Sequence, residues 1–265
     1  MVVLAAVVCV IGILGAVPAT QAARVTDGLL CNWTFDEGQD NTAADSGPRE
    51  YDGTLTGSGV SWVDGQVGSA VRFAGGRSYY VDCGVASRNL PAGLSAATLA
   101  FWAKTESDQG YLFCTSDDND SRLGAQFGSG NMTGCVGSKG AGENWTDGAW
   151  HHYALTWSEN GNGWLRTYVD GQYKSGGNPL TTTLVASSTN LRFGVKSEYP
   201  FNNAGFEYQG AVDEVAIWDR GLTANEIAEV YEVGLLGHNI GWVAPEPAGL
   251  GLVGLALVAL RRKRR

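Results

Sequence analysis

The fold is decided by three consecutive stretches, WHHYALTW at residues 150–157, NGNG at 160–163 and LRTYVDGQ at 165–172. In the first stretch, strand geometry places the odd-numbered residues on one face and the even-numbered residues on the other. The second stretch contains residues that accept positive φ, which is typical of a hairpin turn. Asp170 and Gly171 form a second turn of this kind. The three stretches therefore predict an antiparallel meander.

The remainder of the chain has the pattern of short apolar runs and turn residues that is typical of an all-β protein. Its 265 residues include 38 glycines, and short runs of β-branched and aromatic residues alternate with Gly, Asn, Asp and Ser clusters. The absence of helical periodicity between the runs favours two stacked antiparallel sheets over a βαβ fold. We predict about eleven strands, at residues 29–35, 70–73, 79–83, 97–104, 111–115, 123–127, 134–137, 151–158, 164–169, 190–195 and 210–218.

One short helix is expected near the C-terminal end of this region. Thr223 and Glu226 have the spacing of a capping box, in which each side chain accepts a backbone N–H from the other residue. Ile227 and Val230 begin an apolar stripe, and Gly234 is the expected C-terminal cap. We expect the helix to lie across one edge of the sandwich.

Several motifs in the right order resemble the LamG-like, concanavalin A-like jelly-roll family. They are the paired strands at 150–172, GAVDEVAIWDRGLT at 210–223, and, near the start, WTFDEG at 33–38, ADSG at 44–47, DGTL at 52–55 and VRF at 71–73. The resemblance covers residues 29–234. It implies an all-β fold, an antiparallel two-sheet jelly-roll sandwich with one short C-terminal helix. Fold alone does not settle function.

The last part of the chain combines an acidic residue between prolines, an apolar run at 248–260 and a basic end. At ~1.5 Å per residue the run spans about 20 Å, less than the ~30 Å hydrocarbon core of a bilayer. This order resembles the PEP-CTERM sorting signal of exopolysaccharide-producing diderm bacteria, which implies transient membrane anchoring and cleavage by exosortase. An ordinary short anchor is the alternative. The predicted signal residues are Pro245, Glu246, Pro247, Arg261 and Arg262.

The N-terminal end predicts export. Residues 1–17 are almost entirely apolar, and small residues around Ala22 suit cleavage by signal peptidase, although no Lys or Arg precedes the apolar run. We therefore expect a signal peptide at 1–22, a jelly-roll domain at 23–238 and the sorting signal at 239–265. The processed protein is expected at the cell envelope or surface, or secreted.

The exported part is acidic. Without the five basic residues at the C-terminal end, 13 Lys and Arg remain against 27 Asp and Glu, a formal charge of −14. Such a chain has no electrostatic footprint for nucleic acid, so nucleic acid is not an expected partner.

Four cysteines follow the predicted signal peptide, an even number that suits an oxidising compartment. Three pairings of Cys31, Cys83, Cys114 and Cys135 are open. Cys114 and Cys135 flank an expected short meander and are the favoured local bridge. No CxxC motif or Cys/His cluster predicts zinc.

Catalytic motifs are scarce. Glycoside hydrolases on this sandwich need two carboxylates that face one cleft. Asp213 and Glu214 are adjacent on a predicted strand, so regular alternation would point them to opposite faces. His151 and His152 have no Ser nucleophile motif or clear Asp partner, and the resemblance to the LamG-like family implies that they pack within the sheet. The domain is predicted to be non-catalytic; a glycoside hydrolase or lyase is the alternative.

Calcium is the most credible cofactor. Ca²⁺ takes several oxygen ligands from carboxylates and backbone carbonyls, and related LamG-like domains often carry a structural calcium. Asp45 and Asp52, closed in space by Asp213, are the candidate ligands, although Asp and Gly are also ordinary turn residues. The acidic run at 117–121 lacks the Gly and distant Glu of an EF-hand loop and is predicted to be a solvated hairpin tip.

Sugars bind to exposed aromatic rings whose polar neighbours fix their orientation. Five tryptophans on predicted strands are expected in the core: Trp33, Trp102, Trp150, Trp157 and Trp218. Loop residues are the ligand-binding candidates: Trp62, Trp145, Tyr199, Phe201 and Asn202. The preferred function is a secreted or surface module that binds glycan, exopolysaccharide or matrix. A purely structural matrix protein is a third hypothesis.

Overall fold

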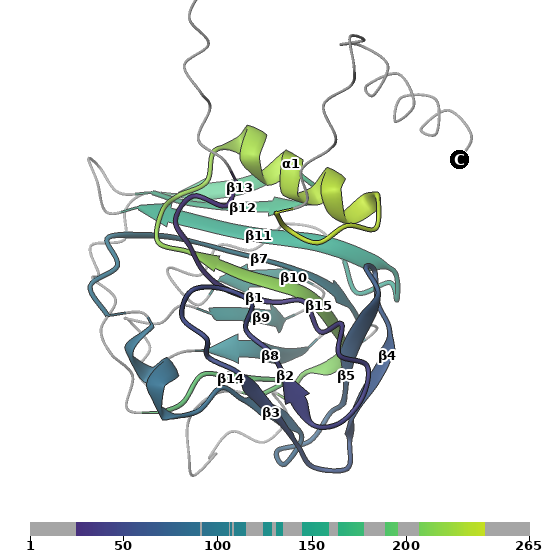
Figure 1. Ribbon diagram of the computed structural model, residues 1–265. Coiled ribbons are helices and arrows are strands. Elements are labelled where there is room, and N and C mark those ends of the chain that lie inside the picture. Colours follow the sequence, from purple (N-terminus) through teal and green to yellow (C-terminus); the bar gives the residue numbers. More distant parts are fainter. Residues whose placement is uncertain are drawn as a thin grey trace, which may run out of the picture.

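A computed structural model describes residues 25–241 except 91, 106, 108, 115–123, 129–130, 135–144, 159–163, 178–188 and 196–206. Two antiparallel sheets stack face to face (Figure 1). This confirms the predicted jelly-roll sandwich. Within the described residues, no helix is long and apolar enough to cross a membrane. The predicted signal peptide and the sorting-signal residues from 242 onward lie outside the described residues.

The first sheet has the strand order β13-β12-β11-β7-β15-β5-β4, and β1 pairs with β15. Its strands are β1 Leu29–Trp33, β4 Val60–Asp64, β5 Ser69–Ala74, β7 Ala96–Lys104, β11 Trp150–Ser158, β12 Trp164–Val169, β13 Gln172–Gly177 and β15 Gln209–Trp218. β12 and β13 are joined by Asp170 (φ 52°) and Gly171 (φ 71°), which confirms the predicted two-residue turn.

The second sheet has the order β10-β9-β8-β14-β6-β3-β2. Its strands are β2 Thr42–Ala43, β3 Gly53–Thr56, β6 Tyr80–Asp82, β8 Gln109–Cys114, β9 Gly124–Gly128, β10 Asn131–Gly134 and β14 Arg192–Phe193. A short 3₁₀ helix, Val85–Asn89, follows β6. The sequence did not predict β2, β3 or β4, which are short and lie among glycines and polar residues.

The two faces of β11 have separate roles, as the alternation predicts. Tyr153, Leu155 and Trp157 belong to the core between the sheets, where the Tyr153 ring stacks on Phe101 with centroids 5.4 Å apart. Ala154 belongs to a second apolar cluster on the outer face of the first sheet, together with residues of the helix. β11 therefore contributes side chains to both apolar clusters.

The helix α1, Ala224–Leu235, lies along the outer face of the first sheet (Figure 1), so the prediction that it crosses one edge of the sandwich is wrong: its apolar side packs on residues of the central strands. Thr223 and Glu226 form the predicted capping box. The predicted C-cap is wrong. Gly234 lies within the helix, where a Cβ would come within 2.5 Å of Trp102 Nε1, so glycine is required for close packing. Leu236 is the C-cap, and Gly237 (φ 77°) follows it in the left-handed conformation.

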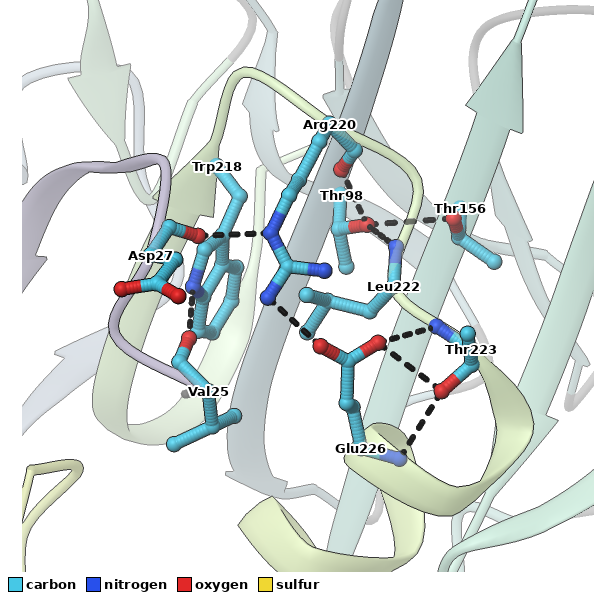
Figure 2. Close-up of polar contacts among 9 residues, drawn as sticks. All are labelled: Val25, Asp27, Thr98, Thr156, Trp218, Arg220, Leu222, Thr223 and Glu226. Atoms are coloured by element: carbon cyan, nitrogen blue, oxygen red, sulfur yellow. Dashed lines mark hydrogen bonds and ion pairs between the residues drawn. The ribbon is translucent and has the colours of Figure 1, made fainter. Parts of the chain in front are cut away.

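Figure 2 shows the polar network that connects the end of β15 to α1 and to the N-terminal segment; we call it the Arg220 network. Arg220 Nη2 pairs with Glu226 Oε1 at 2.6 Å, and Arg220 Nε donates to the Asp27 carbonyl at 2.6 Å. Trp218 Nε1 donates to the Val25 carbonyl at 2.7 Å. These contacts tie the first described residues to the helix.

The same network reaches into the sheet through Thr98 on β7. Its hydroxyl donates to the Arg220 carbonyl and accepts the Leu222 N–H, each at 2.8 Å, beside the Thr156 hydroxyl at 3.1 Å (Figure 2). Two polar residues of the 210–223 motif, Arg220 and Thr223, therefore help to dock α1 onto the sheet.

The cysteine prediction stays open. Cys31 and Cys83 are buried free thiols, and burial raises the pKa of each. Cys114 ends β8, but Cys135 lies outside the described residues, so the favoured bridge stays a prediction.

Candidate functional site

A groove of about 710 Å³ opens on the part of the first sheet that is formed by β4, β5, β15, β7 and β11. We call it the Arg72–Lys104 groove. Its lining is about equally polar and apolar and, among the described residues, includes one tryptophan. The lining residues are Val63, Asp64, Arg72, Lys104, Thr105, Ser107, Gly148, Trp150, Gln209, Gly210 and Ala211.

The floor of the groove is one row of cross-strand neighbours. Ala211 on β15 pairs with Arg72 on β5 at one side and with Lys104 on β7 at the other. The row continues from Lys104 to Trp150 on β11 and from Arg72 to Ser61 on β4. Register alone therefore places two cations beside a tryptophan on one face of the sheet.

Ala211 sets the shape of this floor. Neighbouring strands lie about 4.8 Å apart, so the backbones of Arg72 and Lys104 are separated by roughly 10 Å, with only a methyl side chain between them. Arg72 and Lys104 are both exposed. Because Val71, Ala103 and Val212 fill the core, alternation places Arg72, Lys104 and Ala211 on the outer face.

A turn after β7 forms one wall of the groove. The buried Thr105 hydroxyl donates to the Gln209 carbonyl at 2.5 Å and accepts the Ser107 N–H at 2.9 Å. Gly148 N donates to the Thr105 carbonyl at 3.1 Å, which holds the segment before Trp150 against the same turn. The wall is thus fixed by hydrogen bonds before any ligand arrives.

In the part of the chain that the structure describes, the two groove cations differ from three arginines that form ion pairs. Arg77 pairs with Glu207, Arg192 with Asp82 and Arg220 with Glu226. Among the described residues, Arg72 and Lys104 have no hydrogen-bonded or ion-paired side-chain partner. The described part of the groove lining therefore presents two cations without ion pairs and one carboxylate, Asp64, on a protein of formal net charge −9.

A buried pair of carboxylates lies on β15, close to the groove. Asp213 is 0 % exposed and Glu214 3 %, and burial raises their pKa values to about 8 and about 9. A β-bulge lies between Asp213 and Ala216, and Glu214 has φ 51°. The bulge adds one residue to the strand, so the regular alternation assumed from the sequence does not apply here.

Oxygen atoms gather where Asp213 meets the loop after β4. Asp213 Oδ2 accepts the Val67 N–H at 2.9 Å, and a Cβ placed on Gly65 would lie 2.6 Å from Asp213 Oδ2 and from the carbonyl oxygens of Val67 and Ser69. Asp213 Oδ1 is buried and has no partner among the described residues. Asp36 adds a nearby carboxylate, whose Oδ1 accepts the Ser69 N–H at 3.0 Å.

The structure does not bring the three predicted calcium ligands together. Asp45 and Asp52 meet, because Asp52 Oδ1 accepts the Asp45 N–H at 2.9 Å. The Asp45 carboxylate in turn accepts the N–H groups of Asn32, Gly47 and Tyr51 and is already satisfied as a turn residue. Among the described residues, no group of three or more His, Cys, Asp or Glu side chains is arranged to hold a metal ion.

The predicted aromatic candidates take other roles. Trp62 and Trp145 are half-buried and pack against the core; Trp62 Nε1 donates to the Asp40 carbonyl at 2.9 Å. Lys174 Nζ lies 4.6 Å from the centroid of a Trp145 ring. Tyr199, Phe201 and Asn202 lie outside the described residues. Trp150, expected in the core, is instead half-buried and lines the groove.

The paired histidines have opposite environments. His151 Nδ1 lies 2.9 Å from Asp170 Oδ2, and its Nε2 lies 3.2 Å from Asp147 Oδ1; hydrogen bonding to Asp170 raises the pKa of His151. The expectation that no Asp partner exists was wrong. His152 is buried beside Tyr231, and burial lowers its pKa to about 4. Neither histidine lines the groove.

Sequence reasoning missed the groove because no motif encodes it. Arg72 lay inside the VRF motif at 71–73, and Lys104 ended a predicted strand. The signal lies in pairings between strands far apart in the sequence, which requires the strand order. With that order known, the row could have been read from register.

Sequence and structure comparisons agree on the fold. The model of the concanavalin A-like lectin/glucanases superfamily matches residues 75–228. A protein from Mus musculus, "Sushi, von Willebrand factor type A, EGF and pentraxin domain-containing protein 1", is 28% identical over 152 residues, which are 51% of this chain and 4% of that protein. The match thus spans a small part of the relative.

Two solved structures resemble the chain at low identity. The binding domain of Paraclostridial Mosquitocidal Protein 1 has a TM-score of 0.59 at 15% identity, covering 78% of this chain and 52% of that one. Domain 4 of AbnA, a GH43 extracellular arabinanase from Geobacillus stearothermophilus solved with arabinotriose, has a TM-score of 0.56 at 21% identity, covering 77% and 98%.

A sialidase of Trypanosoma rangeli, in a mutant that displays trans-sialidase activity, gives a TM-score of 0.57 at 16% identity, covering 81% of this chain and 34% of that one. These likenesses support the sandwich and leave the activity open. Since the family model spans more than half of the sequence, this chain belongs to the concanavalin A-like lectin/glucanases superfamily.

Proposed function

We propose that this protein is a non-catalytic module that binds carbohydrate in the Arg72–Lys104 groove. The carrying observation is the lining itself, which, among the described residues, combines Trp150, Gln209 and hydroxyl groups with one carboxylate, Asp64. A tryptophan face covers a sugar ring, while amide and hydroxyl groups fix its orientation. One carboxylate cannot supply the acid and the nucleophile or base of glycoside hydrolysis.

The buried acids do not supply the missing partner. Asp213 and Glu214 do not line the groove, and both are almost completely excluded from solvent. His151 has acid partners, but it too lies outside the groove lining. The relatives fit a binding role, since one is described as a toxin's binding domain and another was solved with arabinotriose.

A glycan array probed with the full-length chain tests the proposal. We expect binding that falls roughly tenfold in Trp150→Ala, because the sugar loses its stacking surface. Trp164→Ala is the matched control: it removes another half-buried strand tryptophan, on β12 and away from the groove. No binding to any glycan, or equal losses in both variants, would reject the groove as the binding site.

We further propose that Ca²⁺ binds beside the groove, with ligands that differ from the sequence prediction. Asp213, Asp36 and the carbonyl oxygens of Val67 and Ser69 would hold it: Asp213 Oδ2 lies with the two carbonyl oxygens around Gly65, and Asp213 Oδ1 is buried without a partner among the described residues. These are the hard oxygen ligands that Ca²⁺ prefers. Bound Ca²⁺ would neutralise the carboxylates and fix the loop that follows Asp64, which itself lines the groove.

Thermal unfolding with Ca²⁺ and with EDTA tests this site. A calcium-dependent rise in Tm is expected for the native chain and for Asp45→Asn, and is expected to vanish in Asp213→Asn. An equal response in Asp213→Asn would contradict the assignment.

The terminal segments suggest how the module reaches its ligand. We propose export through the signal peptide at 1–22 and exosortase processing near Pro245, Glu246 and Pro247, which the order of apolar and basic residues supports. Mass spectrometry of the exported protein is the test. A mature product that ends near residue 247 is expected, and an intact Arg265 would exclude processing.

A further inference from the structure

We propose that the Arg72–Lys104 groove selects negatively charged saccharides, which carry carboxylate or sulfate groups, over neutral ones. This inference rests on the proposed carbohydrate-binding function and adds the chemical class of the ligand. It comes from the arrangement of the two cations in the groove.

The spacing of the cations suits a chain of sugars better than a single small anion. Arg72 and Lys104 stand on strands separated by β15, so their backbones lie roughly 10 Å apart, across the methyl group of Ala211. A disaccharide unit has comparable length. One acidic sugar can therefore lie at each cation while the glycan chain crosses Ala211, where no large side chain obstructs it.

The charge balance around the groove supports an anionic ligand. Two uncompensated cations near each other repel, and a bridging anion removes that repulsion. The guanidinium of Arg72 can hold a carboxylate or sulfate through two parallel N–H bonds, whereas Lys104 acts as a point charge. Among the described residues, no acidic side chain forms an ion pair with Arg72 or Lys104.

The other side chains that line the groove suit different parts of a sugar. Trp150 is the cross-strand neighbour of Lys104, so a sugar held by Lys104 lies beside an aromatic ring. Asp64 lies at the β4 end of the lining and can accept hydroxyl groups of the sugar. The groove thus offers a charged centre, a stacking surface at one end and an acceptor at the other.

Isothermal titration of the full-length chain tests the selection. The probes are an oligogalacturonate, a sulfated dextran oligomer, a neutral dextran oligomer and arabinotriose. Titrations at 0.15 M NaCl, where the Debye length is about 8 Å, screen the repulsion between an acidic protein and an acidic glycan. We expect at least one anionic probe to bind tighter than both neutral probes, and the two anionic probes separate carboxylate from sulfate recognition.

The decisive variant is Arg72→Gln with Lys104→Gln. Each lost charge-assisted contact is expected to weaken anionic binding roughly tenfold, while neutral binding changes less than threefold. Arg49→Gln with Arg166→Gln is the matched control, because both arginines are exposed and do not line the groove. It makes the same change in net charge and should leave anionic binding intact.

The outcomes separate this inference from the function on which it rests. Equal affinity for neutral and anionic probes, or equal losses in the two double variants, overturns charge selection and leaves carbohydrate binding standing. Failure to bind any of the probes, together with a blank glycan array, overturns both. Circular dichroism spectra and Tm values that match the native chain show that each variant is folded.

Discussion

The outer face of the first sheet has two differently constructed regions. At the start of α1, the charged and polar groups of the Arg220 network pair with one another, and Trp218, Leu222 and Ile227 form part of the apolar cluster on this face. In the Arg72–Lys104 groove, two cations on the same face have no side-chain partner among the described residues. Paired groups under a helix stabilise the fold, whereas unpaired groups over an open floor are available to a ligand.

The largest expected effect lies in the covered region. Trp218 is completely buried, so Trp218→Ala should lower the free energy of unfolding by about 3–5 kcal/mol through lost burial, a cavity and the lost bond to Val25. Urea denaturation measures it. Trp164→Ala, at a half-buried position, should cost distinctly less. A loss below about 1 kcal/mol for Trp218→Ala would show that docking of α1 contributes little.

The free energy of unfolding should depend on pH through a histidine at the boundary between the two regions. His152 lies under α1 two residues from Trp150, and burial holds its folded-state pKa at about 4, below the ordinary 6.5. As pH falls below 6.5 the unfolded chain takes up the proton first, so stability is lost between about pH 6.5 and 4. Between pH 7.5 and pH 5, protonation linked to His152 should lower the free energy of unfolding by about 2 kcal/mol.

Comparing urea denaturation of the native chain and of His152→Met at both pH values isolates that contribution, which should disappear in the variant. His151 contributes in the opposite direction, because hydrogen bonding to Asp170 raises its pKa. Its stabilisation is present at low pH and is lost as pH rises through the raised pKa. An unchanged pH dependence in His152→Met would contradict the buried neutral histidine.

A smaller effect is expected at the start of α1. Glu226→Ala removes the ion pair with Arg220 and one half of the capping box, and should cost about 1–2 kcal/mol. Glu229→Ala, at an exposed position of the same helix, should change stability by less than about 0.5 kcal/mol. Similar costs for the two variants would mean that the Arg220 network does not fix the helix.

The smallest stability effect is expected in the groove. Arg72→Gln with Lys104→Gln should change the free energy of unfolding by no more than about 0.5 kcal/mol, since exposed groups without partners are removed. Denaturation beside the binding titrations checks this. A cost above about 2 kcal/mol would assign the cations to stability and erase the contrast between the two regions.

Local patterns in the sequence predicted local structure well. The alternation in 151–157 predicted which side chains face each core, and Thr223 with Glu226 predicted the helix start. Both depend on residues within a few positions of each other. Gly234 failed as a cap because a tertiary contact, its approach to Trp102, determines its role.

The site could not be predicted in the same way. The groove joins residues from β5, β7, β11 and β15, whose register depends on the complete strand order. The bulge beside Asp213 interrupts the alternation of the strand without any composition signal, so the sequence could not show that Asp213 and Glu214 are both buried. Long-range pairing, more than residue type, determines the groove.

A crystal structure of the protein with a bound oligogalacturonate tests the central claim most directly. We predict a glycan lying across Ala211, with acidic groups within hydrogen-bond distance of Arg72 and Lys104 and a sugar ring against Trp150. A glycan bound on the second sheet, or on the surface of α1 with the groove empty, would contradict it.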